Sequence, residues 1–252
     1  MLVAERYEKI VQLVNERGSI RVTELSQLCN VTEETIRRDL DRLEQAGRLR
    51  RSHGGAVSIK DQQTEIPYFE RETSHAEEKK RIALEAIERI QPNERIVLDA
   101  STTAWYMASY LPDIPLTVLT NSIKVATELS SKEKIEVIST GGLLAQKSLS
   151  FVGPLAERSL DSYHVNKVFL SCKGVHLRRG ISESNELQAR VKQKMIDMAD
   201  QVILLADSSK FGVQALTRVA DLNQVDAIIT DRNIAKETLD QLKELAISLT
   251  TV

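Results

Sequence analysis

The sequence predicts an α/β protein with a small helical N-terminal domain and a larger C-terminal α/β domain that holds a mostly parallel sheet. Two observations predict this class. Apolar residues recur at helical spacing through about the first fifty positions, and short apolar runs alternate with helical stretches over the rest of the chain. With 252 residues, 42% apolar and 28% charged, the chain has an ordinary globular composition and is long enough for two domains.

Charge and hydropathy exclude several classes of protein. The formal charge is -2, from 34 Lys+Arg against 36 Asp+Glu. Residues 1–60 carry 11 basic and 9 acidic side chains, a charge of +2, which leaves 23 against 27, or -4, for the remainder. The chain becomes charged at Glu5 and has no apolar run of about 18 residues, so we expect neither a membrane span nor a secretory signal, and a cytoplasmic protein.

The metal-binding side chains are scattered. Cys29 and Cys172 lie far apart, with no Cys or His at metal-ligand spacing beside them, and the four histidines do not cluster. We therefore expect two small buried cysteines, no disulfide framework and no bound metal.

Three amphipathic helices are expected at the N-terminus. The first carries apolar residues at positions i, i+3, i+4 and i+7 and ends before Gly18. Its apolar positions are Tyr7, Ile10, Val11 and Val14. The second covers about 22–29. The third starts at Thr32, a good N-cap, and runs until Gly47 offers a C-cap.

A β-hairpin over 48–57, with Gly54–Gly55 as its turn, follows the third helix. Three helices with a tight turn before the third, then a hairpin, are typical of a winged helix-turn-helix. Its third helix inserts its N-terminal half into the DNA major groove. The side chains placed to reach bases or phosphates are Thr32, Glu34, Thr35 and Arg38. Phosphate-neutralising side chains on the hairpin are Arg48, Arg50 and Arg51. The alternative is an ordinary charged surface helix, on which pairs such as Glu34 with Arg38 are common.

The third helix and hairpin also carry a family resemblance. The string Val31–Glu44, followed by Gly47 and by Arg51–Ala56, closely resembles the signature of the DeoR family of bacterial sugar-responsive transcriptional regulators. The resemblance implies that this region is a winged helix-turn-helix. It also implies DNA-facing side chains at Thr32, Thr35, Arg37 and Arg38, with His53 and Gly54 in the wing.

The rest of the chain divides into a linker and a sheet-forming domain. Residues 58–75 are polar and lack a sustained period, so we expect domains over 1–57 and 76–252 joined by this linker. A helical pattern runs from Glu77 to Pro92. The expected strands are then 95–98, 116–119, 135–138, 167–170, 202–206 and 227–229. Helices are expected near 104–110, 123–129, 186–199 and 234–245.

Polar loops follow five of these strands, at 99–103, 120–122, 139–142, 171–174 and 207–210. Ligands of open α/β sheets bind outside the carboxyl ends of the strands. Three hydroxyl residues at one helix start suit a phosphate: Ser101, Thr102 and Thr103. Lys173 and Lys210 supply positive charge. Sugar hydroxyls would be held by Asp99, Asn121 and Glu186. The loops therefore predict a phosphorylated sugar, although any single loop fits equally well an N-cap or a surface ion pair. The sequence has neither a Walker loop nor a strand-linked G-x-G-x-x-G, so we expect no cofactor.

This half of the chain looks like the DeoR-family effector domain, which the resemblance relates to ribose-5-phosphate isomerase. Its implied ligand-binding elements are Asp99 with Thr102–Thr103, Thr120–Asn121, Gly141–Gly142, Asn185–Glu186 with Lys192, and Ala206–Gly212. Ser101 replaces the usual family Gly, and 171–174 also departs from the family pattern. The string Leu98–Tyr106 is similar to the branch that controls use of six-deoxy sugars.

These observations predict a transcriptional regulator, in this family most often a repressor, that binds operator DNA and a sugar phosphate. A helix-turn-helix reads paired half-sites, so we expect a homodimer or homotetramer. One alternative is a sugar-phosphate isomerase, with Asp99, Glu186 or Asp207 as general base and Lys173 or Lys210 stabilising an enediolate. Another is a constitutive DNA-binding protein whose second domain only oligomerises.

Overall fold

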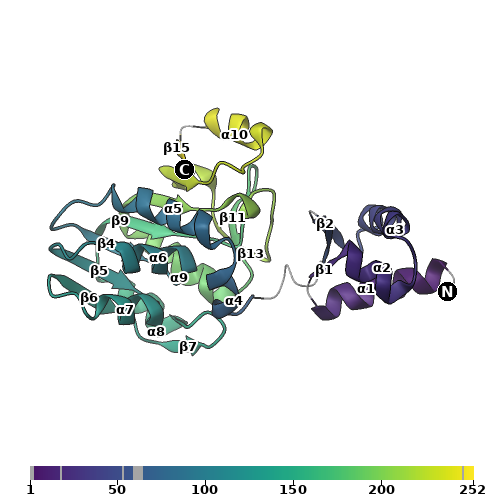
Figure 1. Cartoon of the computed structure of the whole chain (residues 1–252). Helices are drawn as coiled ribbons and strands as arrows, with labels where there is room; N and C mark the ends of the chain where they lie inside the picture. The colour runs from purple at the N-terminus through teal and green to yellow at the C-terminus, as the bar shows by residue number, and fades with distance from the viewer. Residues whose placement is uncertain (1–2, 18, 53, 59–64, 246) are drawn as a thin grey trace. The chain divides into compact units, whose positions relative to one another are not determined.

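The computed structural model describes residues 3–17, 19–52, 54–58, 65–245 and 247–252. Two compact units divide the chain, Met1–Glu65 and Ile66–Val252 (Figure 1). Residues 66–75, which we predicted as the second half of a linker, therefore belong to the second unit. They contain the short helix α4 (Tyr68–Thr73), whose Tyr68 side chain is 1% exposed. A helix of six residues is too short to show a hydrophobic period, which explains the difference.

The first unit contains the predicted three helices and hairpin. Its helices are α1 (Val3–Arg17), α2 (Val22–Cys29) and α3 (Glu33–Gln45). Its strands are β1 (Ser19–Arg21), β2 (Arg50–Ser52) and β3 (Gly55–Val57), in the order β1-β3-β2. The sequence did not predict β1, a strand of three residues. Each helix buries apolar side chains in one core, which stabilises the unit: fully buried are Ile10, Val14, Leu25, Ile36 and Leu40.

The hairpin turn differs from the predicted Gly54–Gly55 pair. Ser52 pairs with Gly55 across the hairpin, so Gly55 is a strand residue. Of the two glycines, Gly54, with φ +83, is the one that lies in the turn. Gly55 is needed for another reason. A Cβ atom there would lie 2.2 Å from the carbonyl oxygen of Ile20 on β1, so only glycine lets the two strands approach.

The second unit is built on a parallel sheet of seven strands. They are β4 (Arg95–Leu98), β5 (Leu116–Thr120), β6 (Ile135–Ser139), β9 (Val165–Leu170), β12 (Ala199–Leu205), β14 (Ala227–Thr230) and β15 (Ser248–Thr251). All six predicted strands are confirmed, and β15 is additional. The order is β15-β14-β12-β9-β4-β5-β6.

Helices cover both faces of this sheet (Figure 1). One face is covered by α5 (Ala76–Ile87), α6 (Thr102–Tyr110) and α7 (Ile123–Leu129). The other is covered by α8 (Pro154–Leu160) and α9 (Glu186–Asp197), and α10 (Lys236–Lys243) packs against the same core. Alternation along β4 shows the two faces, because Ile96 and Leu98 join one core and Val97 the other.

Shorter elements complete the second unit. A hairpin pairs β7 (Leu143–Ala145) with β8 (Ser150–Val152). A separate antiparallel sheet has the order β10-β11-β13, from β10 (Gly174–His176), β11 (Gly180–Glu183) and β13 (Thr217–Ala220). Two single turns are η2 (Ser208–Lys210) and η3 (Leu222–Gln224). Within the described ranges, no helix is both long and apolar enough to cross a membrane.

The strand order reverses between β4 and β9. The chain runs outward from β4 through β5 and β6, returns to β9 on the other side of β4, and continues outward through β12 to β15. In such sheets the crevice outside the carboxyl ends of the two strands at the reversal is the usual ligand site. The loops at this point start at Asp99 and Ser171, two of the five predicted from the sequence.

Candidate DNA-binding and effector sites

The predicted DNA-reading residues surround the start of α3. Thr32 is the N-cap, and its Oγ1 accepts a hydrogen bond of 3.3 Å from the Thr35 backbone N–H. The Thr32 and Thr35 hydroxyls lie 2.9 Å apart. Arg37 and Arg38 are exposed on the same helix, with side chains 51% and 74% accessible. The structure therefore brings this predicted set together at one end of one helix.

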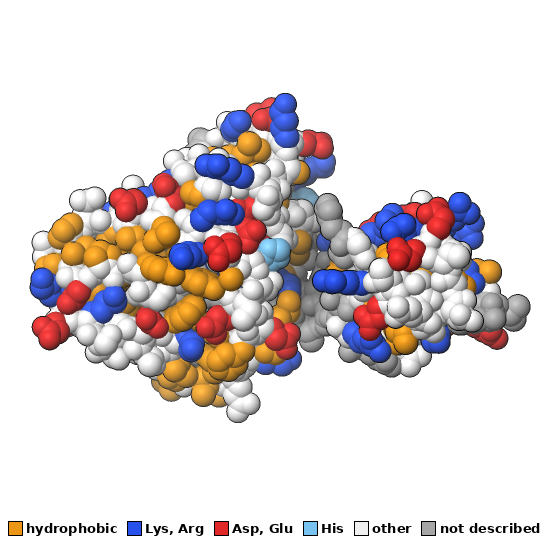
Figure 2. Space-filling view, viewed as in Figure 1, with side chains coloured by type: hydrophobic (Ala, Val, Ile, Leu, Met, Phe, Trp, Pro, Cys, Tyr) orange, Lys and Arg blue, Asp and Glu red, His pale blue; other side chains and the backbone are white. Residues whose placement is uncertain are grey.

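Most of the arginines in the first unit are paired with carboxylates. Arg37 contacts Glu33 at 3.0 Å and Arg38 contacts Glu34 at 3.2 Å, which is the pairing expected of a surface helix. Exposed pairs of this kind contribute little stability, so a DNA phosphate can replace the carboxylate. Figure 2 shows basic and acidic side chains interspersed on the visible face of this unit.

On the hairpin side, the predicted phosphate contacts differ in availability. Arg48 forms a two-point ion pair with Glu8, at 2.7 and 2.8 Å. Arg51 pairs with Asp41. Arg50 is exposed and has no ion-pair partner among the described residues. The Gly54 carbonyl accepts a 2.8 Å hydrogen bond from the Val22 N–H, which ties the hairpin to α2, and predicted His53 lies outside the described residues.

Sequence reasoning missed the contact that fixes α3 against α1. The Arg6 guanidinium lies 2.5 Å from the carboxylate of Asp39, and both side chains are nearly buried. The hydrogen bond to Asp39 raises the pKa of Arg6 above its ordinary value, although burial opposes it. Asp39 therefore orients the reading helix and does not face DNA.

Asp99 joins the two loops at the strand reversal. This fully buried carboxylate accepts backbone hydrogen bonds of 3.0 Å from Ser101 and from Ser171, one after β4 and one after β9. Lys192 on α9 lies 3.0 Å from Asp99 and 2.5 Å from Glu183. Burial alone would lower the pKa of Lys192, but Glu183 and Asp99 outweigh burial and raise it. The ammonium group is therefore a fixed positive charge beneath the crevice.

The helix starts at the crevice are capped. Ser101 accepts a 3.1 Å hydrogen bond from the Ala104 N–H, so its hydroxyl has the structural role that we kept as the alternative. Thr102 and Thr103, each 3% exposed, form the first turn of α6, where backbone N–H groups lack helical partners. Asn121 donates to the Phe151 carbonyl at 3.0 Å, but its buried Oδ1 has no partner among the described residues.

A second charged group lies at the end of β12. Asp207 is buried and accepts a 3.1 Å hydrogen bond from the Ser209 N–H. Burial would raise the pKa of Asp207, but Lys210, Ser209, His75 and Lys79 together lower it. Asp207 is therefore ionised, with several positive groups around it.

Lys79 on α5 is the site residue that the sequence did not indicate. Its ammonium group donates to the Arg71 carbonyl and, at 2.6 Å, to the Ser74 carbonyl. Burial, together with the nearby charge of Lys210, lowers the pKa of Lys79 to about 8. Lys79 follows α4 in a charged helical stretch, where nothing in the sequence distinguishes it from its neighbours.

Other predicted residues have contacts of their own. Gly142 has φ +117, and a Cβ atom there would lie 2.9 Å from the Val152 carbonyl oxygen, so its role is close packing beside β8. Gly141, with φ +61, precedes it in the same turn. Glu186 is exposed and pairs with Arg190 at 2.8 Å. The Lys173 backbone N–H donates to the Ser182 carbonyl at 3.0 Å, and its side chain is half-buried.

The cysteines are buried and unbonded, as predicted. Burial raises the pKa of the Cys172 thiol to about 12, so it stays protonated beneath the crevice. Among the residues that the structure describes, no three His, Cys, Asp or Glu side chains lie close enough to hold a metal ion.

A winged helix-turn-helix combined with an α/β unit that gathers charged and polar groups at its strand reversal defines a DNA-binding regulator with a sensor domain. The family models agree with this class. A DeoR-like helix-turn-helix domain matches residues 6–62, and a DeoR C terminal sensor domain matches residues 74–232. The chain belongs to the DeoR family of transcriptional regulators, as the sequence motifs predicted.

Relatives with curated descriptions match over most or all of the chain. The HTH-type transcriptional regulator YulB of Bacillus subtilis is 57% identical over 252 residues, covering 100% of this chain and 98% of that protein. The L-fucose operon activator of Haemophilus influenzae is 42% identical, covering 91% and 92%. Ribose 5-phosphate isomerase A of Methanocaldococcus jannaschii aligns over 55% of each chain, with a TM-score of 0.41 and 16% identity.

Proposed function

We propose that this protein is a homodimeric or homotetrameric regulator of a carbohydrate-utilisation operon, and that a phosphorylated sugar controls its affinity for operator DNA. The observation that carries the proposal is the crevice at the strand reversal. There a buried Asp99–Lys192 ion pair holds two loops together. A regulator of operator DNA acts in the cytoplasm, which is where we place it.

Charges around the crevice support a phosphorylated ligand. Lys210 is close enough to Lys79 to lower the pKa of Lys79, and the first turn of α6 presents backbone N–H groups. Asp207 and the unpartnered Asn121 Oδ1 are acceptors for sugar hydroxyls. Phosphate would pair with Lys210, which is partly exposed, and sugar hydroxyl groups would satisfy the acceptors. No further cofactor is part of the proposal.

The same contacts favour a regulator over an isomerase. A general base needs an oxygen that is free to take a proton. Asp99 is already held by two backbone N–H groups and Lys192, and Glu186 pairs with Arg190 on the surface. Exchange of a substrate C–H with deuterated water, for a sugar phosphate that binds, would contradict the non-enzymatic proposal.

A thermal-shift panel of the full-length protein tests ligand binding. The panel pairs fructose, deoxyribose, fuculose and rhamnulose phosphates with their free sugars, and fuculose and rhamnulose phosphates test the six-deoxy branch. Ligand at about a hundred times its Kd should stabilise the protein by roughly 2.7 kcal/mol. We expect one sugar phosphate to raise the unfolding temperature of the protein and its free sugar to leave it unchanged. This thermal shift should be lost in Lys79→Ala. It should be kept in Lys236→Ala, which changes an exposed residue on α10. Silence across the panel would contradict a sugar-phosphate effector.

A DNA-binding assay tests the regulatory half of the proposal. An operator selected from random double-stranded DNA is titrated with protein, with and without the sugar phosphate that binds. A ligand shifts an equilibrium only if it prefers one of the two states, so we expect operator affinity to change. Unchanged affinity would favour the reading in which the second unit only oligomerises. A promoter–reporter fusion gives the sign: we expect repression from the family resemblance, although a relative 42% identical is an activator. Sedimentation velocity gives the subunit number.

A further inference from the structure

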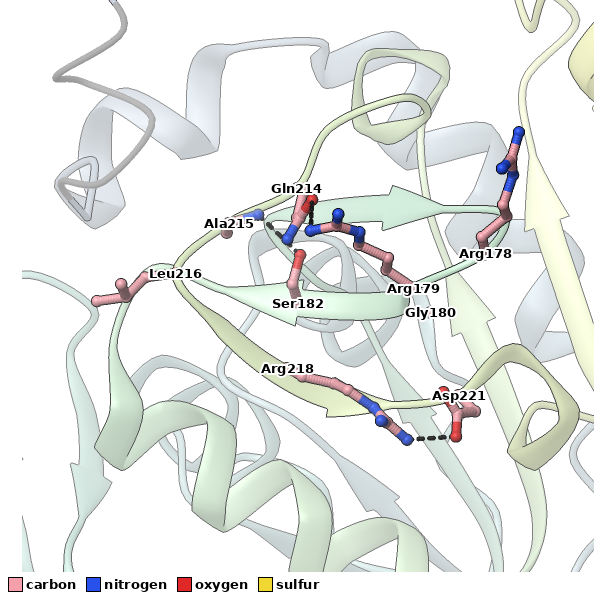
Figure 3. A pocket seen from close by; sticks show the side chains of 9 residues that line it. All are labelled: Arg178, Arg179, Gly180, Ser182, Gln214, Ala215, Leu216, Arg218 and Asp221. Carbon is pink, nitrogen blue, oxygen red and sulfur yellow. Dashed lines mark hydrogen bonds and ion pairs between the residues drawn. The ribbon is translucent and has the colours of Figure 1, made fainter.

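A pocket of about 320 Å³ lies on the small sheet β10-β11-β13, and none of its lining residues was singled out from the sequence (Figure 3). Its lining residues are Arg178, Arg179, Gly180, Ser182, Gln214, Ala215, Leu216, Arg218 and Asp221. Ser182 pairs with Arg218 across β11 and β13, so their side chains share one face of the sheet. That face is opposite to buried Ile181, which belongs to the hydrophobic core. The pocket therefore lies on the outer face of the small sheet.

The pocket has an excess of positive charge. It holds three arginines and one carboxylate. Asp221 neutralises Arg218, with which it forms an ion pair. Arg179 donates at 2.9 Å to Gln214, which carries no charge, and Arg178 has no side-chain partner within the described ranges. Figure 3 shows Arg179 directed at Gln214 and Arg218 directed at Asp221, whereas the Arg178 side chain extends away from them at the end of the hairpin. Two guanidinium groups therefore lack an anion.

The backbone that presents these arginines is tightly packed. Gly180 has φ +75, and a Cβ atom there would lie 2.0 Å from the Ala220 carbonyl oxygen. Glycine at this position lets the turn that bears Arg178 and Arg179 lie against β13. On the opposite wall, Ser182 Oγ accepts a 2.9 Å hydrogen bond from the Ala215 N–H and donates to the Gly174 carbonyl at 3.3 Å. The walls are therefore held in place before any ligand arrives.

We propose that this pocket is a second anion site, which binds a small molecule carrying phosphate or carboxylate groups. Planar guanidinium groups bind both of these anions through two parallel hydrogen bonds. A volume near the lower end of ordinary ligand clefts, roughly 300 Å³, suits a compact metabolite better than a polymer backbone, which would need an open groove. The proposal does not depend on the sugar-phosphate crevice.

Strand β11 connects the two sites. Ser182 lines the pocket, and the next residue, Glu183, holds Lys192 at 2.5 Å beneath the crevice. The Ser182 carbonyl also accepts the hydrogen bond from the Lys173 N–H. An anion that draws β11 and β13 together acts on the strand that positions the charged floor of the crevice. Binding at one site should therefore alter affinity at the other, and linkage makes this effect reciprocal.

Calorimetric titration of the full-length protein with inorganic pyrophosphate tests the proposal at constant ionic strength. In the double variant R178A/R179A, we expect one binding event to weaken about tenfold or more, because each charged hydrogen bond contributes about that factor. The same event should survive in K210A, which alters the other site, and in R81A, which removes an exposed arginine from α5. R178K/R179K keeps the charge without the planar guanidinium group. Its affinity for pyrophosphate should lie between those of the wild type and R178A/R179A.

Three results would overturn the proposal. One is that the wild-type protein shows no pyrophosphate-binding event that R178A/R179A weakens. Another is equal weakening in R81A, which would show non-specific attraction to surface charge. A third is a changed subunit number for R178A/R179A in sedimentation velocity, which would assign the arginines to contact with a second copy. If only the crevice proposal failed, the binding event sensitive to R178A/R179A would persist and no response sensitive to K210A would be found. The two failures are therefore distinguishable.

Discussion

At the scale of single residues, buried charges hold the crevice together. Lys192 is only 8% exposed at its side chain and contacts two carboxylates, of which Asp99 is fully buried. Charges removed from water are stable only while their partners remain. Loss of Lys192 would therefore leave the negative charges of Asp99 and Glu183 without their cation.

Replacement of Lys192 by Met should destabilise the second unit by about 3–5 kcal/mol, because it leaves two buried carboxylates without their cation. Urea unfolding, followed by tryptophan fluorescence, measures the change. The matched control is Lys194→Met on the same helix, whose partner Asp161 is exposed, and it should unfold nearly as the wild type does. Equal destabilisation by the two variants would show that the loss comes from α9 and not from the buried pair.

Lys79 should make stability depend on pH in the alkaline range. Its pKa is about 8 when folded against an ordinary 10.5, so the unfolded chain binds more protons between these values. Stability therefore rises as pH increases from about 8 towards 10.5. The measurement is the difference in unfolding free energy between the wild type and Lys79→Met, from pH 7 to pH 10. A difference that does not vary with pH would contradict the lowered pKa.

At the scale of elements, prediction succeeded where a hydrophobic period had room to repeat. The three N-terminal helices and six strands of the large sheet were predictable because burial repeats along each of them. The short strands outside the large sheet, such as β7, β10 and β13, were not predicted. Of these three, only β13 pairs with a strand distant in the sequence, because β7–β8 and β10–β11 are local hairpins.

The candidate site was also predictable only in part. Loops at strand ends were predictable from the strand pattern, and both Asp99 and Lys192 were named as site residues, but their ion pair was not predicted. Lys79 was not predictable, because its place beside Lys210 depends on how α5 packs on the sheet. The close approach of Gly142 to the Val152 carbonyl was not predictable, because such an approach has no signature in sequence.

Glycines of the hairpin give a test at this scale. Gly55→Ala places a Cβ atom 2.2 Å from the Ile20 carbonyl oxygen, so β1 must separate from β3. Gly54→Ala meets no atom within 4 Å and should cost only about 1–2 kcal/mol for its left-handed backbone. Differential scanning calorimetry of the first transition should show a larger loss for Gly55→Ala. The reverse order would contradict the three-stranded sheet.

At the scale of the whole molecule, DNA reading and ligand sensing belong to different compact units. Substitutions far apart with no shared contacts act nearly independently on stability. A single substitution should therefore change either operator binding or ligand binding and leave the other unaffected. Coupling between the two requires both units. This separation distinguishes a regulator from a DNA-binding protein whose second unit only oligomerises.

Arg38→Ala and Lys210→Ala should have opposite effects. Arg38 is exposed near the start of α3, so its loss should weaken operator binding about tenfold, in line with one good base or phosphate contact. Its ligand-induced thermal shift should stay that of the wild type. Lys210→Ala should bind operator normally and lose the thermal shift. Fluorescence anisotropy and thermal unfolding measure the two effects.

Arg190→Ala provides the control, because this arginine is exposed and pairs only with Glu186 on α9. It should leave both measurements unchanged. If Arg38→Ala removed the thermal shift as well as operator binding, sensing would require the first unit and the division of labour would be wrong. If Lys210→Ala kept its full response to the sugar phosphate, the ligand would bind away from the end of β12. Loss of the response in Lys79→Ala alone would then place the phosphate at the start of α5.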